Sequence, residues 1–140
     1  MVGVLMNFDI NRREINIFKI GKKYCFKQFF DDRTLFDELS SYYNDQKYRF
    51  ECGSTGERNK IMKLLYSAGY EPIIRDDFQE YLVQIDRFKK YGSVLKNAIE
   101  HTEIGSNRVF LMKDQLSVEQ AIEDGAEKYT DEIDVDRLVL

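Results

Sequence analysis

The sequence predicts an α+β fold with a ferredoxin-like core at about residues 48–112. Signals for strands and helices follow one another there in the order β-α-β-β-α-β, which is the order of that fold. The chain has 140 residues, 43% of them hydrophobic, so one domain can bury a core without disulfides or metal ions. We therefore expect a single domain over 1–140. It would hold a β-meander and a helix in 1–45, an α/β sandwich core and a helix in 46–128, and an acidic-apolar tail in 129–140.

The N-terminal part is predicted to be an antiparallel meander, because apolar and polar residues alternate along it with turn residues between. The expected strands are Val2–Phe8, Arg13–Ile20 and Lys23–Phe30. In the second strand, Ile15 and Ile17 fall on one face, and Phe18 and Ile20 on the other. Asp31 or Asp32 is expected to cap a short helix whose apolar residues are Leu35, Phe36 and Leu39.

Two segments of the core have clear helix-start signals. Ser54 and Glu57 have the spacing of a capping box, and an apolar stripe follows from Ile61 to Ala68. Gly69 is expected to end this helix in the left-handed conformation, and Pro72 prevents its continuation. A second capping box, Ser117–Gln120, is expected to open the C-terminal helix.

The middle of the core is expected to contain a hairpin and a second helix. Glu71–Arg75 and Gln79–Ile85 alternate as strands, and Asp76-Asp77 between them indicates a turn. Asp86 is expected to cap a helix, which would be followed by a strand at Arg108–Met112. The expected apolar stripe of that helix is Phe88, Tyr91, Leu95, Ala98 and Ile99.

Composition argues against several classes of protein. The two cysteines do not make a disulfide framework, and the single histidine, His101, lacks the partners of a zinc site. His101 is expected to contact the last carbonyls of the helix before it. No apolar run reaches the roughly 18 residues of a membrane span, and no secretory leader is visible. We expect a cytoplasmic protein with no metal, no cofactor and no membrane partner.

One loop carries the sharpest candidate chemistry. Cys52 is followed after five residues by Arg58, at the start of a predicted helix, and this spacing resembles the phosphate-binding loop of cysteine-dependent phosphatases. The resemblance implies a nucleophilic thiolate at Cys52 and an anion clamp at Arg58. The residues implied to bind the anion through backbone amides are Gly53, Ser54, Thr55 and Gly56. The alternative explanation is structural, since Ser54 and Glu57 suffice to cap a helix.

A basic segment at 12–27 is the candidate for nucleic-acid binding. It interleaves aromatic residues with the cations Arg12, Arg13, Lys19, Lys22, Lys23 and Lys27. Such strands can offer stacking faces to bases and positive charge to phosphates. At the level of fold, the expected core also resembles RNA-recognition domains, although Gln79–Asp86 lacks their Lys/Arg-Gly-Phe/Tyr signature. The alternative is a half-buried meander with solvated lysines.

The tail at 129–140 alternates acids with apolar residues and ends in Leu138, Val139 and Leu140. It could dock on this chain, on a second copy, or on a protein partner by strand addition. From sequence alone we expect a non-enzymatic binding or adaptor domain that associates with a protein partner or with itself. RNA binding through 12–27 and a thiol enzyme acting through Cys52 are the two alternatives.

Overall fold

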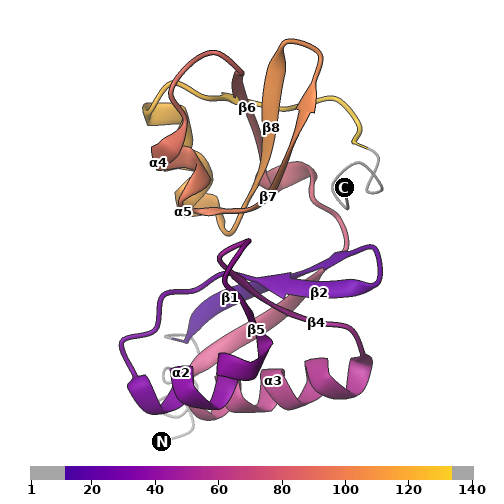
Figure 1. Cartoon of the computed structure of the whole chain (residues 1–140), viewed down its shortest axis with the longest axis vertical. Coiled ribbons are helices and arrows are strands. Elements are labelled where there is room, and N and C mark those ends of the chain that lie inside the picture. The colour runs from indigo at the N-terminus through magenta and orange to yellow at the C-terminus, as the bar shows by residue number, and fades with distance from the viewer. Residues whose placement is uncertain (1–11, 134–140) are drawn as a thin grey trace, which may run out of the picture.

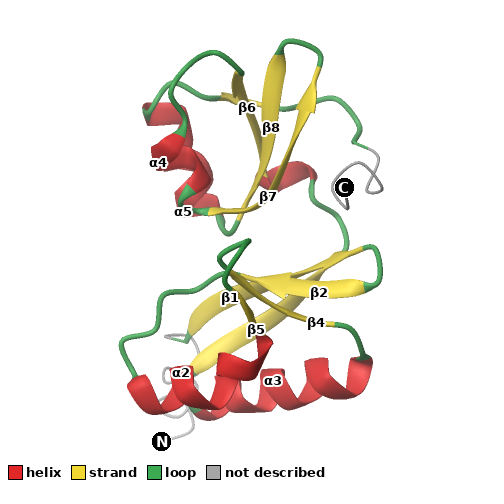
Figure 2. Ribbon diagram, viewed as in Figure 1, coloured by secondary structure: helices red, strands yellow, loops and turns green. Residues whose placement is uncertain are grey.

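The computed structural model of the chain describes residues 12–133, and it is an α+β structure with two separate β-sheets (Figure 1). One sheet is built from the first half of this range and the other from the second half. Each sheet has helices of its own half on one face (Figure 2). The faces without helices contribute to a shared apolar cluster between the two halves.

The first sheet, sheet A, has five strands in the order β3-β4-β2-β1-β5. The elements of this half are β1 (Arg13–Ile20), β2 (Lys23–Phe26), α2 (Arg33–Leu39), a 3₁₀ turn (Ser40–Tyr42), β3 (Tyr43–Asn44), β4 (Arg49–Cys52), α3 (Thr55–Ser67) and β5 (Tyr70–Arg75). Neighbouring strands are antiparallel except β1 and β5, which are parallel. The crossover from β4 through α3 places β5 at the edge beside β1.

The second sheet, sheet B, has four antiparallel strands in the order β7-β8-β6-β9. Its elements are a 3₁₀ turn (Gln79–Tyr81), β6 (Leu82–Asp86), α4 (Gly92–Leu95), β7 (Ala98–Ile104), β8 (Asn107–Met112), α5 (Gln115–Glu123) and β9 (Glu127–Lys128). Helices α4 and α5 lie on the same side of this sheet (Figure 2).

Strand β1 shows how the two halves share their cores. Ile15 and Ile17 pack with the residues under α2 and α3, as the alternation predicts. Phe18 and Ile20 point the other way, into the cluster shared with sheet B. There the Phe18 ring meets the rings of Phe78 and Tyr81 edge-on. Because β1 is apolar on both faces, it is covered on both.

Several local predictions are confirmed. Asp32 caps α2 by accepting from the amides of Thr34 and Leu35. Ser54 caps α3 by accepting from the amide of Glu57. Gly69 follows α3 at φ 98°, in the left-handed region where glycine has no steric penalty.

The predicted ferredoxin-like order at 48–112 is wrong. Glu71–Arg75 is a strand, but it pairs with β1 in sheet A instead of forming a hairpin at Asp76-Asp77. The chain crosses from sheet A to sheet B at that point, and β6 pairs with β8 and β9. The pairing differs because β1 offers β5 a long apolar neighbour, which a turn signal does not reveal. The expected first strand of the meander, Val2–Phe8, lies outside the described residues.

Two helix predictions were wrong in extent. The stripe expected after Asp86 forms only the short helix α4, and Ala98 and Ile99 belong to β7. Gly92 weakens helix propensity within the stripe, and Phe88 at its start is 82% exposed, so burial does not stabilise a longer helix. The N-cap of helix α5 is Asp114, three residues before the expected Ser117, because the Asp114 carboxylate accepts from the Ser117 amide at 2.7 Å.

Replacing Gly69 with alanine should lower the free energy of unfolding by about 1 kcal/mol, because a Cβ strains the left-handed backbone. Gly56→Ala is the matched control, since Gly56 lies inside α3 and has open space around its Cα. This control should be neutral or slightly stabilising. Urea denaturation of both variants checks the pair, and equal effects would contradict the assigned role of Gly69.

Candidate functional site

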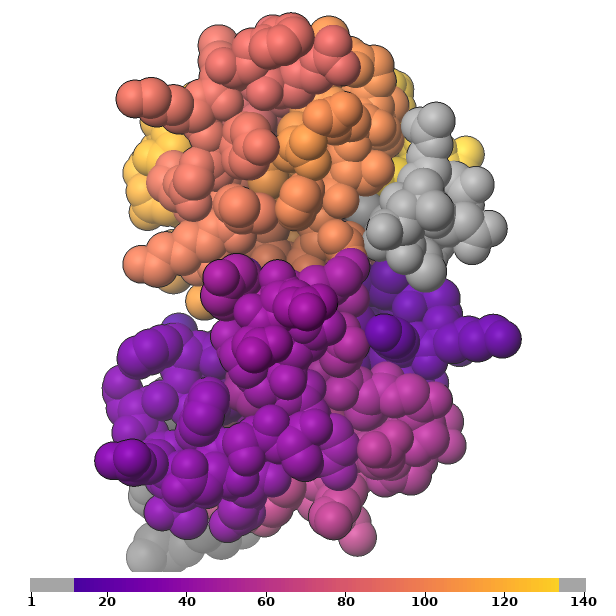
Figure 3. Space-filling model, in the orientation of Figure 1, coloured from indigo at the N-terminus to yellow at the C-terminus, as the bar shows by residue number. Residues whose placement is uncertain are grey.

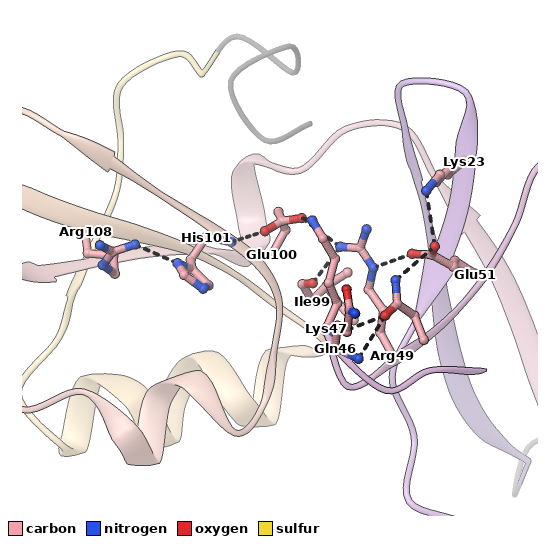
Figure 4. Close-up of polar contacts among 10 residues, drawn as sticks. Lys23, Gln46, Lys47, Arg49, Glu51, Ile99, Glu100, His101 and Arg108 are labelled. Carbon is pink, nitrogen blue, oxygen red and sulfur yellow. Dashed lines mark hydrogen bonds and ion pairs between the residues drawn. The ribbon is translucent and has the colours of Figure 1, made fainter. Parts of the chain in front are cut away.

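A buried ion network joins the two sheets. Arg49 on β4 is only 4% exposed, and its guanidinium reaches across to β7, where Nη1 donates to the Ile99 carbonyl and to the Glu100 carboxylate, each at 2.9 Å (Figure 4). Its Nε donates to Glu51 at 3.0 Å. Lys47 also donates to Glu100, at 2.8 Å. The Glu100 carboxylate in sheet B therefore accepts hydrogen bonds from two cations of the first half, Lys47 and Arg49.

The carboxylates of this network are held in their charged form. Burial alone would raise the pKa of Glu100, but hydrogen bonds from Lys47 and from the His101 amide, with the charge of Arg49, leave it below its ordinary value. The pKa of Glu51 is lowered in the same way against its burial, by hydrogen bonds from Arg49, Asn44 and Lys23. The network is therefore ionised at neutral pH.

A cleft of about 760 Å³ opens beside this network, between the two halves. That volume lies within the range of small-ligand sites, roughly 300–1,000 Å³. In Figure 3 the purple atoms of the first half meet the orange atoms of the second along the line where it forms. Its walls come from the residues just after β2, from β3, β4 and the turn between them, from α4 and β7, and from Lys113 after β8.

The cleft is rich in cations. Its described lining holds the lysines Lys27, Lys47, Lys96 and Lys113. Glu100 is the only carboxylate among the described lining residues, and it is already paired with Arg49 and Lys47. No described carboxylate forms an ion pair with Lys27, Lys96 or Lys113. The free positive charge makes the cleft suited to an anion.

Lys27 is the most unusual of these cations. Its ammonium group donates to the Ala98 carbonyl at 3.0 Å across the boundary between the sheets. Burial, together with the charges of Lys113 and Arg49, lowers its pKa to about 8. An anion in the cleft would relieve this repulsion.

Aromatic rings also line the cleft. Tyr43 and Phe50 contribute to the wall, and their rings meet edge-on at 5.0 Å between centroids. Tyr48 and Phe29 are more open to solvent, at 65% and 81% exposed. Exposed rings beside lysines can stack on planar groups of a ligand.

The cations predicted from the 12–27 segment do not form one surface. Arg12 lies over the Tyr66 ring and bonds the Tyr66 and Tyr70 carbonyls, while Lys23 pairs with Glu51. The remaining exposed cations are Arg13, Lys19 and Lys22. Lys27 alone of the six reaches the cleft.

In the Cys52 loop, the thiol is buried and the arginine is engaged by neighbouring side chains. Cys52 is 7% exposed, and burial followed by the charge of Glu57 raises its pKa. Arg58 lies over the Tyr24 ring and donates to its hydroxyl and to Asn59. Gly53, Ser54, Thr55 and Gly56 form the helix start, where Ser54 is engaged as the cap.

His101 lies in β7, not at a helix end as the sequence indicated. Its Nδ1 is 2.7 Å from an Arg108 guanidinium nitrogen (Figure 4), and burial with the charge of Arg108 lowers its pKa. Within residues 12–133, no three His, Cys, Asp or Glu side chains are grouped to hold a metal ion. In the same range, no helix is long and apolar enough to cross a membrane.

The start of the tail packs on its own chain. Tyr129 is buried in the shared cluster, and Ile133 packs against it. The Gln79 amide donates to the Tyr129 and Asp131 carbonyls at 2.9 and 3.2 Å. Residues 134–140 lie outside the described range, so a partner for the tail stays a prediction.

Sequence reasoning did not find the cleft, because its residues come from four separate segments. One signal was present: the cations Lys47 and Lys113 directly flank the predicted core at 48–112. Nothing in the sequence shows that these ends meet, since the Asp76-Asp77 crossing was interpreted as a hairpin.

Arg49→Met should lower the free energy of unfolding by about 3 kcal/mol, because Glu51 and Glu100 lose their shared cation in a poorly solvated position. Lys23→Met is the control, since Lys23 is exposed and its pair with Glu51 should contribute less than about 1 kcal/mol. Chemical denaturation measures both changes. A loss below about 1 kcal/mol for Arg49→Met would show that the network does not hold the halves together.

Comparison with known proteins gives no relative from which a function could be carried over. No family model matches the chain, and no curated protein or solved structure matches it. A function for this chain is therefore inferred from the chemistry of its cleft.

Proposed function

We propose that this chain is a non-enzymatic binding domain that holds an anionic ligand in the cleft between its two sheets. The observation that carries the proposal is the charge of the lining: its one described carboxylate, Glu100, is paired with Arg49 and Lys47, and three further lysines have no described ion pair. Charge without internal partners is costly to gather on one surface, and an anionic ligand offsets that cost.

The lining of the cleft is better suited to binding a ligand than to catalysing a reaction. A catalytic site needs a nucleophile or an acid–base group held within reach of a reacting atom. The lining offers His101, whose Nδ1 is occupied by Arg108, and Lys27, whose amine is bonded to a carbonyl. Cys52 lies outside the lining, and its raised pKa disfavours the thiolate that a phosphatase mechanism requires.

The cleft is also a better anion site than the β1–β2 hairpin, where the sequence placed nucleic-acid binding. Lys19 and Lys22 on the hairpin are exposed and do not line the cleft. Fully solvated lysines bind anions weakly because water and salt screen their charge. Lys27 belongs to both candidate sites, since it is part of the basic segment at 12–27 and also lines the cleft.

The double variant Lys96→Gln/Lys113→Gln should weaken binding of a fluorescent sulfated oligosaccharide by about tenfold at about 50 mM salt, because two phosphate-like contacts are lost. The slope of log K against log salt should also fall by about 2. Lys19→Gln/Lys22→Gln removes the same charge from the hairpin and should change affinity little. Fluorescence anisotropy gives these values, and equal losses in the two double variants would place the anion elsewhere.

Affinity for the same probe should fall by about fivefold as pH rises from about 7 to about 9, since Lys27 loses its proton near pH 8 and with it one charged contact. Despite its burial, the pKa of Arg49 is raised by its ion pairs, and the pKa values of Glu100 and His101 are lowered, so none of these three neighbours changes its charge over this range. Lys27→Gln should remove the pH dependence.

Loss of folding would not explain this change. Folded Lys27 releases its proton at a lower pH than the unfolded chain does, so the free energy of unfolding rises with pH above about 8. Thermal unfolding on the same samples separates the two effects. A pH dependence that persists in Lys27→Gln would contradict the assignment.

A further inference from the structure

The lip of the cleft carries two rings whose exposure the fold does not require. Phe29, after β2, is 81% exposed, and Tyr48, in the turn before β4, is 65% exposed. Both line the cleft together with the lysines. No described ring stacks on either of them.

Tyr48 also has an unfavourable backbone. Its φ is 54°, and it is the only residue other than glycine with a positive φ among residues 12–133. A glycine or asparagine would occupy that position at lower cost. Because its ring is mostly outside the core, packing does not offset the strain. Strained residues with exposed side chains cluster at binding sites.

The polar groups of the cleft complement these rings. The lining adds the side-chain amides of Gln28, Gln46 and Asn97, which can both donate and accept hydrogen bonds. A ligand that fits this combination has repeated negative charges, planar faces and polar edges. Nucleotides joined in a chain have all three.

We infer that the cleft is a binding site for single-stranded nucleic acid, with bases stacked on Tyr48 and Phe29 and phosphates held by Lys27, Lys96 and Lys113. This inference rests on the proposed function and adds the class of ligand. A base in a duplex hides both faces, so only an unpaired strand offers them to the rings. The lysines supply affinity independent of sequence, and the amides contact base edges.

The test compares three probes of equal length: a single-stranded oligoribonucleotide of adenine and cytosine, an abasic strand with the same backbone, and a duplex RNA. Anisotropy titrations at fixed salt should give about a hundredfold tighter binding for the single strand than for the abasic strand, since two stacked bases each contribute roughly tenfold. The duplex should bind no better than the abasic strand. A single-stranded DNA of the same length shows whether the sugar contributes to the affinity.

Variants of the rings complete the test. Tyr48→Gly should weaken single-strand binding by about tenfold while leaving abasic binding unchanged and the melting temperature equal or higher, because it relieves the backbone strain. Tyr48→Phe keeps the ring and should keep the affinity. Phe29→Ser should act as Tyr48→Gly does, and Phe88→Ser is the matched control, since Phe88 is equally exposed but lies outside the lining.

The outcomes separate the two proposals. Equal binding of the single strand and the abasic strand would overturn the nucleic-acid site and leave an anion site. Tighter binding of the duplex, or an effect of Phe88→Ser equal to that of Phe29→Ser, would also overturn it. No binding of any charged probe, sulfated oligosaccharide included, would overturn the proposed function as well.

Discussion

The contact between Arg49 and β7 determines how the two halves of the molecule meet. Apolar surfaces pack in many registers, but a guanidinium with fixed acceptors tolerates few. Glu51 lies on the same strand as Arg49 and orients it before it reaches the other sheet. Removing two charges from water is expensive, so such a network contributes more to a defined geometry than to stability. The cleft depends on that geometry, since Glu100 and Lys47 belong to both.

A second group of contacts supports the same arrangement from the other side. Asn16 on β1 donates to the Lys113 carbonyl at 3.1 Å, and Arg75 donates to Asn16 at 3.0 Å. With the bond from Lys27 to Ala98, these contacts anchor the backbone at the start of β7 and just after β8. The cleft walls are therefore fixed by bonds to main-chain atoms, which makes the site largely preorganised for a ligand.

Local structure was predictable where one short segment determines it. The caps at Asp32 and Ser54, the end of α3 at Gly69 and the two faces of β1 follow from periodicity and hydrogen-bonding groups. Strand pairing was not predictable, because the choice of β5 between β1 and β6 depends on competition between distant partners. The α+β class is confirmed, because it does not depend on which strands pair, whereas the ferredoxin-like order does depend on it and is wrong.

The cleft was not predictable for the same reason. The sequence drew attention to clusters of chemistry along the chain, at Cys52–Arg58 and at 12–27. In the structure, Ser54 caps a helix, and Arg12 and Arg58 make cation–π contacts. Other lysines of the 12–27 segment are solvated on the β1–β2 hairpin. The cleft gathers residues from four segments spread between positions 27 and 113, and only the packing of the two halves brings them together.

The double-sided burial of β1 has a consequence for the modularity of this protein. Sheet A with its helices resembles a transferable unit, but a chain ending at Arg75 would leave Phe18, Ile20 and Cys25 without their cover. Such a fragment would expose an apolar surface and would tend to associate with its own copies. The halves have therefore to be inherited, moved or recombined as a pair, and a successful fusion or circular permutation would have its cut at an outer loop instead of at the crossing.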